Sequence, residues 1–151
     1  MKRLLFFFLI ILLAQGSFTG CKKSNAEKAV RRDITGSWEL KQTSGMLTTN
    51  YPPGSGNVLQ FTASAFKRYT NGRLAQSGTY KIVADNTVST STCLVVTDGQ
   101  YKNRIVFSND RHRKVFMQLS DTTLLLLSGC FAYDAGTSST YTRIENPALS
   151  E

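Results

Sequence analysis

The side chains best suited to catalysis are scarce in this chain and are not grouped. Its 151 residues include one histidine and three cysteines. His112 lies in a basic segment from Asp110 to Lys114, where we expect an exposed turn in which the imidazole has no catalytic partner. The sequence contains no G-x-S-x-G motif of the serine hydrolases. One histidine and the cysteines do not favour a metal site.

The carboxylates do not form a candidate acid-base pair either. Four aspartates stand beside residues that favour turns, and we expect them to shape those turns: Asp98, Asp110, Asp121 and Asp134. A site with two cooperating carboxyl groups would require two distant turns to meet, and nothing in the sequence indicates that they do. We therefore expect a protein that is not an enzyme and that uses no metal and no cofactor.

Cys21 stands in the most specific sequence context. Lys2 and Arg3 precede an uninterrupted apolar run of 11 residues from Leu4 to Ala14, which suits the hydrophobic region of a signal peptide and is too short to span a bilayer. The segment Ser17 to Cys21 resembles the lipobox of bacterial lipoproteins, in which the cysteine after a small residue is lipidated. The resemblance implies a signal peptide at 1–20 and acyl chains, such as palmitate, on Cys21. The alternative is an ordinary secretory peptide with Cys21 as a structural cysteine.

The residues after Cys21 indicate where such a lipoprotein would reside. Lys22 stands where an aspartate would retain a lipoprotein in an inner membrane, so the resemblance implies the outer membrane, and the absence of an acidic cluster favours its periplasmic face. Residues 21–33 are expected to form a flexible tether, whose five basic residues either contact anionic headgroups beside the anchor or remain solvated. The net charge of the chain is only +8, and much of it lies before residue 34, so we expect no nucleic-acid partner.

Cys93 and Cys130 remain as an even pair in an oxidising compartment. This predicts a disulfide between them, with two separate buried thiols as the alternative.

The domain at 34–151 has the pattern of antiparallel β-structure, because short β-branched and aromatic runs alternate with turn residues. Asn71-Gly72 predicts a type I′ turn that places Tyr69 opposite Leu74, and Gly78 predicts a bulge or bend in the following strand. The expected strands are Gly36–Thr43, Val58–Thr62, Ala65–Thr70, Arg73–Val83, Thr92–Thr97, Arg104–Ser108, Lys114–Leu119, Thr123–Ser128 and Ser139–Ile144. About eight such strands predict an all-β, up-and-down barrel, with a β-sandwich as the alternative.

Two motifs at the ends of this domain favour the barrel. Gly36-Ser37-Trp38 opens the first strand and Arg143 stands in the last, and the pair resembles the lipocalin family. The resemblance implies that Trp38 plugs one end of the barrel and that Arg143 packs over its ring, where a guanidinium gains cation-π attraction. The segment from Ser44 to Asn57 is then expected to be the long loop over the open end.

An eight-stranded barrel has room for its own side chains or for one small ligand. The residues expected to line such an interior are aromatic: Tyr51, Phe61, Phe66, Tyr69, Tyr80, Phe107 and Phe116. Each can equally serve as ordinary core packing. We therefore expect a lipid-anchored envelope protein that binds or carries a small hydrophobic molecule. The alternative is a filled barrel that acts as an interaction or envelope-maintenance module.

Overall fold

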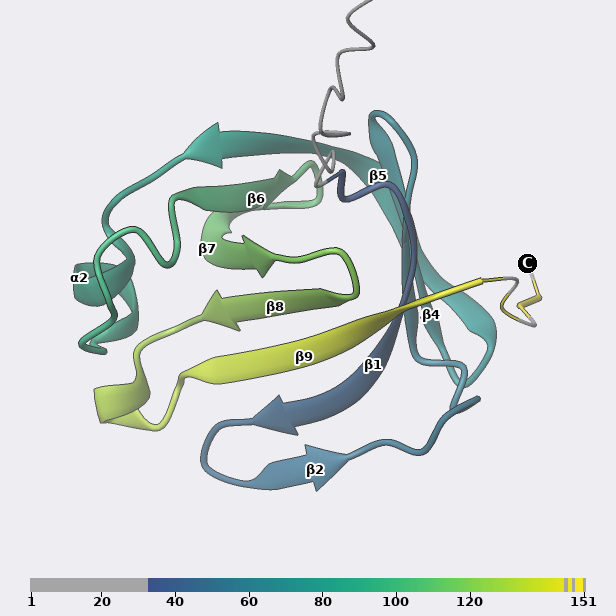
Figure 1. Ribbon diagram of the computed structural model, residues 1–151, viewed down its shortest axis with the longest axis horizontal. Coiled ribbons are helices and arrows are strands. Elements are labelled where there is room, and N and C mark those ends of the chain that lie inside the picture. Colours follow the sequence, from purple (N-terminus) through teal and green to yellow (C-terminus); the bar gives the residue numbers. More distant parts are fainter. Residues whose placement is uncertain (1–32, 146, 148, 151) are drawn as a thin grey trace, which may run out of the picture. The chain divides into compact units, whose positions relative to one another are not determined.

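A closed antiparallel barrel dominates the computed structural model, which describes residues 33–145, 147, 149 and 150. Its strands are β1 (Gly36–Ser44), β2 (Thr48–Asn50), β3 (Val58–Phe61), β4 (Ala65–Thr70), β5 (Arg73–Ala84), β6 (Asn103–Phe107), β7 (Asp110–Leu119), β8 (Thr123–Ser128) and β9 (Thr137–Ile144). All except β2 follow one another around the barrel in sequence order, and β1 pairs with β9 to close it (Figure 1). The predicted up-and-down barrel of eight strands is confirmed, and the sandwich alternative is wrong.

Strand β1 pairs with two different strands along one of its edges. Its first residues, Gly36–Glu39, pair with β3, and its last residues pair with β2, while its other edge carries β9. A bulge between Leu40 and Gln42 interrupts the pairing with β9. The segment expected as one long loop therefore begins as a β1–β2 hairpin, and Tyr51 follows it with its N–H donating to the carbonyl of Lys41.

The β4–β5 hairpin has the predicted turn and register. Asn71 and Gly72 have φ values of 51° and 79°, as a type I′ turn requires. Tyr69 lies opposite Leu74. The prediction is confirmed because positive φ at two successive positions is a strong local constraint.

The bulge in this hairpin is not at Gly78. The register shifts opposite Ala75, whereas Gly78 pairs regularly with Phe66. A Cβ at Gly78 would lie 2.7 Å from Oγ of Ser108 and 3.2 Å from the Phe66 ring. Close packing between neighbouring strands, and not a bend, explains this glycine.

The expected strand Thr92–Thr97 is wrong. Helix α2 (Val88–Thr92) and an extended loop occupy this region. The alternating apolar residues Leu94 and Val96 pack against a cluster of buried side chains on the outer wall of the barrel: Val88, Tyr101, Phe116 and Leu127. The alternation of apolar residues in this segment is therefore explained by packing against the outer wall of the barrel, and not by a strand.

A disulfide ties this outer loop to the barrel. Cys93 and Cys130 are bonded, with their Cα atoms 5.0 Å apart, so the predicted pairing is confirmed. Cys130 directly precedes the short helix η1 (Phe131–Tyr133) between β8 and β9. The bridge thus joins the β5–β6 connection to the β8–β9 connection.

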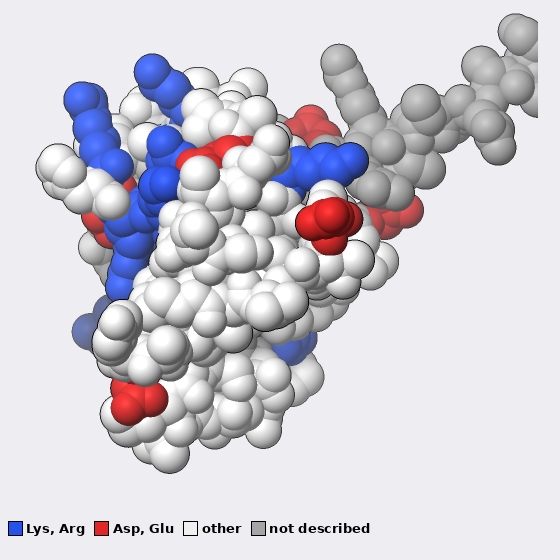
Figure 2. Space-filling view, turned by 90° about the vertical axis from the view of Figure 1, so that its left-hand side faces the viewer, with Lys and Arg blue, Asp and Glu red and all other residues white. Residues whose placement is uncertain are grey.

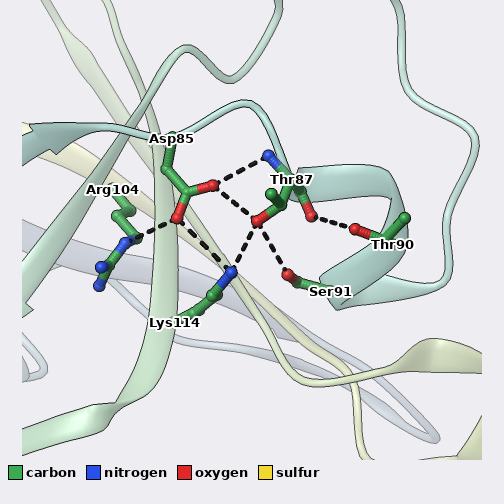
Figure 3. A network of polar contacts seen from close by, with 6 residues as sticks. All are labelled: Asp85, Thr87, Thr90, Ser91, Arg104 and Lys114. Atoms are coloured by element: carbon green, nitrogen blue, oxygen red, sulfur yellow. Dashed lines mark hydrogen bonds and ion pairs between the residues drawn. The ribbon is translucent and has the colours of Figure 1, made fainter.

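A polar network anchors the other end of the same loop (Figure 3). One carboxylate oxygen of Asp85 accepts from the backbone N–H and the hydroxyl of Thr87, at 2.9 and 2.6 Å. Its other oxygen lies 2.8 Å from Nε of Arg104 and 3.6 Å from Nζ of Lys114. The side chain of Asp85 is only 11% exposed, so these charged contacts compensate for its burial.

Candidate ligand-binding cavity

One end of the barrel is closed by Trp38 and Arg143. Trp38 is fully buried, and its Nε1 donates to the carbonyl of Ile34 at 2.7 Å. The guanidinium of Arg143 lies 4.3 Å from the centre of the Trp38 ring. It also donates to the carbonyls of Asp33, Thr35 and Asp121 at 2.7, 2.7 and 2.9 Å. This is the packing expected for the two motif residues.

Aromatic side chains fill the interior next to that plug. Phe61 and Phe66 both pack against Phe107, with ring centres 6.5 and 4.6 Å away, and Tyr80 lies edge-on to Phe61 at 5.0 Å. The hydroxyl of Tyr80 donates to the carbonyl of Thr62. These contacts are those of a packed core, so this part of the barrel has no room for a ligand.

A cavity of about 220 Å³ remains at the other end. Its lining comes from six strands and the β6–β7 turn: Arg68, Gln76, Phe107, Asn109, Asp110, Arg113, Val115, Leu126, Ser128, Thr137, Ser139 and Tyr141. Phe107, Val115 and Leu126 are buried and apolar, whereas Asn109, Asp110 and Arg113 are exposed. The cavity thus has an apolar wall and a polar mouth.

Arg68 is the one charged residue of this lining that is not exposed. It follows Phe66 on β4 by two positions, and alternation along a strand puts both on the inner face. Arg68 is half-buried, and its guanidinium carbon lies 5.9 Å from the centre of the Phe107 ring. Its Nε is buried and has no hydrogen-bond partner within the described part of the chain.

Tyr141 borders the cavity beside Arg68. Burial raises the pKa of its phenol, while Arg68 and a hydrogen bond with Ser139 lower it in part and Tyr51 raises it further. Tyr141 and Arg68 also line a second hollow, of about 80 Å³, together with Leu40 and Leu59. Tyr51 lines neither of these two hollows.

The structure separates the seven aromatic residues predicted to line a ligand site. Only Phe107 lines the cavity of about 220 Å³. Phe61, Phe66 and Tyr80 belong to the packed core, and Tyr69 is buried outside that cluster. Phe116 lies on the outer wall under the α2 loop, so its assignment to the interior is wrong.

Sequence reasoning missed Arg68, Tyr141 and the hydroxyl residues of the cavity. The signal for Arg68 was present, because a period of two from Phe66 places it on the inner face. Ser128, Thr137 and Ser139 carry no such signal, since only barrel closure brings β8 and β9 to Arg68.

Two more open hollows, of about 410 and 610 Å³, border the β5–β6 connection. Lys and Arg side chains gather toward the top of the face that Figure 1 shows at its left (Figure 2). Arg104 and Lys114 are paired with Asp85, and His112 is exposed. Among the described residues no group of three or more His, Cys, Asp or Glu side chains could hold a metal ion. In the same part of the chain no helix is long and apolar enough to cross a membrane.

The predicted signal peptide (1–20), Cys21 and nearly all of the tether (21–33) lie outside the described residues. Comparisons of the chain with family models, with curated proteins and with solved structures found no match. The closed eight-stranded barrel is compatible with a lipocalin-like fold. The cavity and the N-terminal motif are therefore the features of this protein that bear on its function.

Proposed function

We propose that this protein is a lipid-anchored, lipocalin-like binding protein of the cell envelope that holds a small, mainly hydrophobic molecule without changing it chemically. The single observation that carries this proposal is the cavity in a barrel that is plugged at its other end. Phe107, Val115 and Leu126 provide an apolar wall for the ligand. The volume of about 220 Å³ is below the range of pockets for drug-sized ligands, so the ligand is small or inserts only part of a chain.

The location in the envelope rests on the N-terminal sequence. The apolar run Leu4 to Ala14, followed by a small residue and Cys21, supports export and lipidation. Metabolic labelling with an alkyne analogue of palmitate tests it. The wild type should be labelled, and Cys21→Ser should not.

Native mass spectrometry of the protein purified from its own host tests the binding function. We expect a stoichiometric apolar adduct that organic extraction releases. Ser139→Phe places a ring in the cavity and should abolish the adduct, whereas Ser138→Phe, on the opposite face of β9, should retain it. A wild-type protein that carries no adduct and takes up no added octanamide, a neutral eight-carbon probe, would contradict the proposal.

A second candidate function, an interaction module, is favoured by exposed apolar side chains at the rim. Met46, Leu47 and Tyr133 are 73%, 79% and 82% exposed. The β1–β2 turn lies beside the β8–β9 connection, because a Cβ at Gly45 would approach the carbonyl of Gly136. A deletion strain distinguishes the two functions: rescue by Ser139→Phe but not by Leu47→Asp favours the interaction module.

A further inference from the structure

The guanidinium of Arg68 is an unusual lining group for a site expected to hold a purely hydrophobic molecule. The side chain is half-buried inside a barrel, and its Nε is buried without a hydrogen-bond partner in the described chain. A buried donor of a charged group that makes no hydrogen bond destabilises a folded protein. Structure alone therefore does not account for an arginine at this position.

The contacts of Arg68 offset little of the cost of burying its charge. Its guanidinium lies near the Phe107 ring, at 5.9 Å from the centroid, which is at the outer limit of a cation-π interaction. No described carboxylate forms an ion pair with it. Asp110 borders the same cavity but is exposed at the mouth, where Arg113 is also exposed. Among the residues that the structure describes, the inner part of the cavity thus has a positive charge and no anion.

Hydroxyl groups surround the same hollow. Ser128, Thr137, Ser139 and Tyr141 line it with Arg68, and each can donate a hydrogen bond. Arg68 and Tyr141 line both this cavity and the smaller hollow beside it, so the two side chains are neighbours. A cation flanked by hydroxyl donors matches an oxygen anion, because a guanidinium binds carboxylate and phosphate oxygens through paired N–H groups.

We infer that the ligand of this cavity is an amphiphile with one short apolar chain and an anionic oxygen headgroup, and that Arg68 binds the headgroup. The inference rests on the proposed binding function and specifies the chemical class of its ligand. The apolar chain lies against Phe107, Val115 and Leu126, and the headgroup lies at Arg68 with Tyr141. A carboxylate and a phosphate monoester share this chemistry.

Titration calorimetry with two isosteric probes tests the role of charge. The full chain is held in phosphatidylcholine nanodiscs, and empty nanodiscs are titrated in parallel to subtract partitioning into lipid. Octanoate and octanamide have the same chain and differ in headgroup charge. We expect the wild type to bind octanoate about tenfold more tightly, as a charge-assisted hydrogen bond provides. Octyl phosphate in a third titration identifies which anionic headgroup binds more tightly.

Variants assign this preference to one residue. Arg68→Met keeps the apolar stem and should bind both probes with the affinity that the wild type has for octanamide. Arg113→Met removes an equal charge from the exposed mouth of the same cavity and should keep the preference for octanoate. Arg68→Lys should keep part of it. If Arg68→Met does not fold, as judged by circular dichroism, Arg68→Gln replaces it with the same expectation.

Two outcomes overturn the inference, and only one of them also overturns the proposed binding function. Equal binding of octanoate and octanamide by the wild type, or a preference that survives Arg68→Met, refutes recognition of the anion and leaves the binding function in place. Binding of no probe by the wild type, together with no adduct in native mass spectrometry, refutes both.

Discussion

Replacing Arg143 with methionine should lower the free energy of unfolding by about 2–3 kcal/mol. The guanidinium lies 4.3 Å from the centre of the Trp38 ring, and losing this cation-π interaction removes about 1 kcal/mol. Its hydrogen bond to the part-buried carbonyl of Thr35 contributes about 1.5 kcal/mol, as expected for a charged donor. The bonds to Asp33 and Asp121 are exposed, and water replaces the donor there. Methionine keeps the apolar contact with the ring, so the loss measures the charged group.

Guanidinium denaturation followed by tryptophan fluorescence measures this change. Trp38 is the only tryptophan of the chain, so the signal comes from the plug itself. Lys81→Met removes an exposed cation from the barrel wall and should change the free energy of unfolding by less than about 0.5 kcal/mol. Arg143→Lys should lose most of the stabilisation, because an ammonium cannot reach three carbonyls while stacked on the ring. A loss below about 1 kcal/mol for Arg143→Met, or an equal loss for Lys81→Met, would refute the reasoning.

Two further perturbations concern the outer loop. Asp85→Asn should lower the free energy of unfolding at neutral pH by about 2 kcal/mol, because the charge-assisted bonds with Thr87 and Arg104 are weakened. The hydrogen bond from Thr87, with smaller contributions from Lys114 and Arg104, lowers the pKa of Asp85 below its ordinary value of 3.8. The wild type therefore has this stabilisation above pH 3.8 and loses it as the pH falls through the lower folded-state pKa. The free energy of unfolding of both proteins is measured over a series of acidic pH values. If that of Asp85→Asn falls as much as that of the wild type below pH 3.8, the assignment is contradicted. The double variant Cys93→Ser/Cys130→Ser should lose about 3–4 kcal/mol, since the bridge spans a sequence separation of 37 residues. A reducing agent should shift the denaturation midpoint of the wild type toward that of the double variant, and no shift would show that the bridge stabilises little.

Local sequence patterns were sufficient to predict most of the strands. The Asn71-Gly72 turn set the register of its hairpin, because both residues tolerate positive φ and a two-residue loop permits one alignment. Similarly, the pairing of Cys93 with Cys130 needed only the count of cysteines and the inferred compartment. The prediction of Cys21 as a lipidation site also depends on local sequence, and it stays a prediction.

Local patterns failed where a segment packs on a surface built from distant residues. Leu94 and Val96 alternate like strand residues, yet they cover the outer wall at Phe116. Phe116 is as apolar as its inward-facing neighbours. Nothing nearby in the sequence shows whether the outer face of its strand is covered by a loop or faces water. Both errors have the same cause, since a barrel strand under a packed loop is buried on both faces.

The sequence by itself determined the all-β class and the scarcity of catalytic groups, because both depend on residue type and short-range spacing. The plug formed by Trp38 and Arg143 was implied by the resemblance to lipocalins. Only the tertiary structure decided which part of the barrel is filled and which is hollow. The aromatic residues of β3, β4 and β6 converge near the plug, whereas Arg68 meets hydroxyl groups of β8 and β9 across the open cavity. Strand tilt and barrel closure determine which of these side chains lie close together, and neither property is encoded in any single segment.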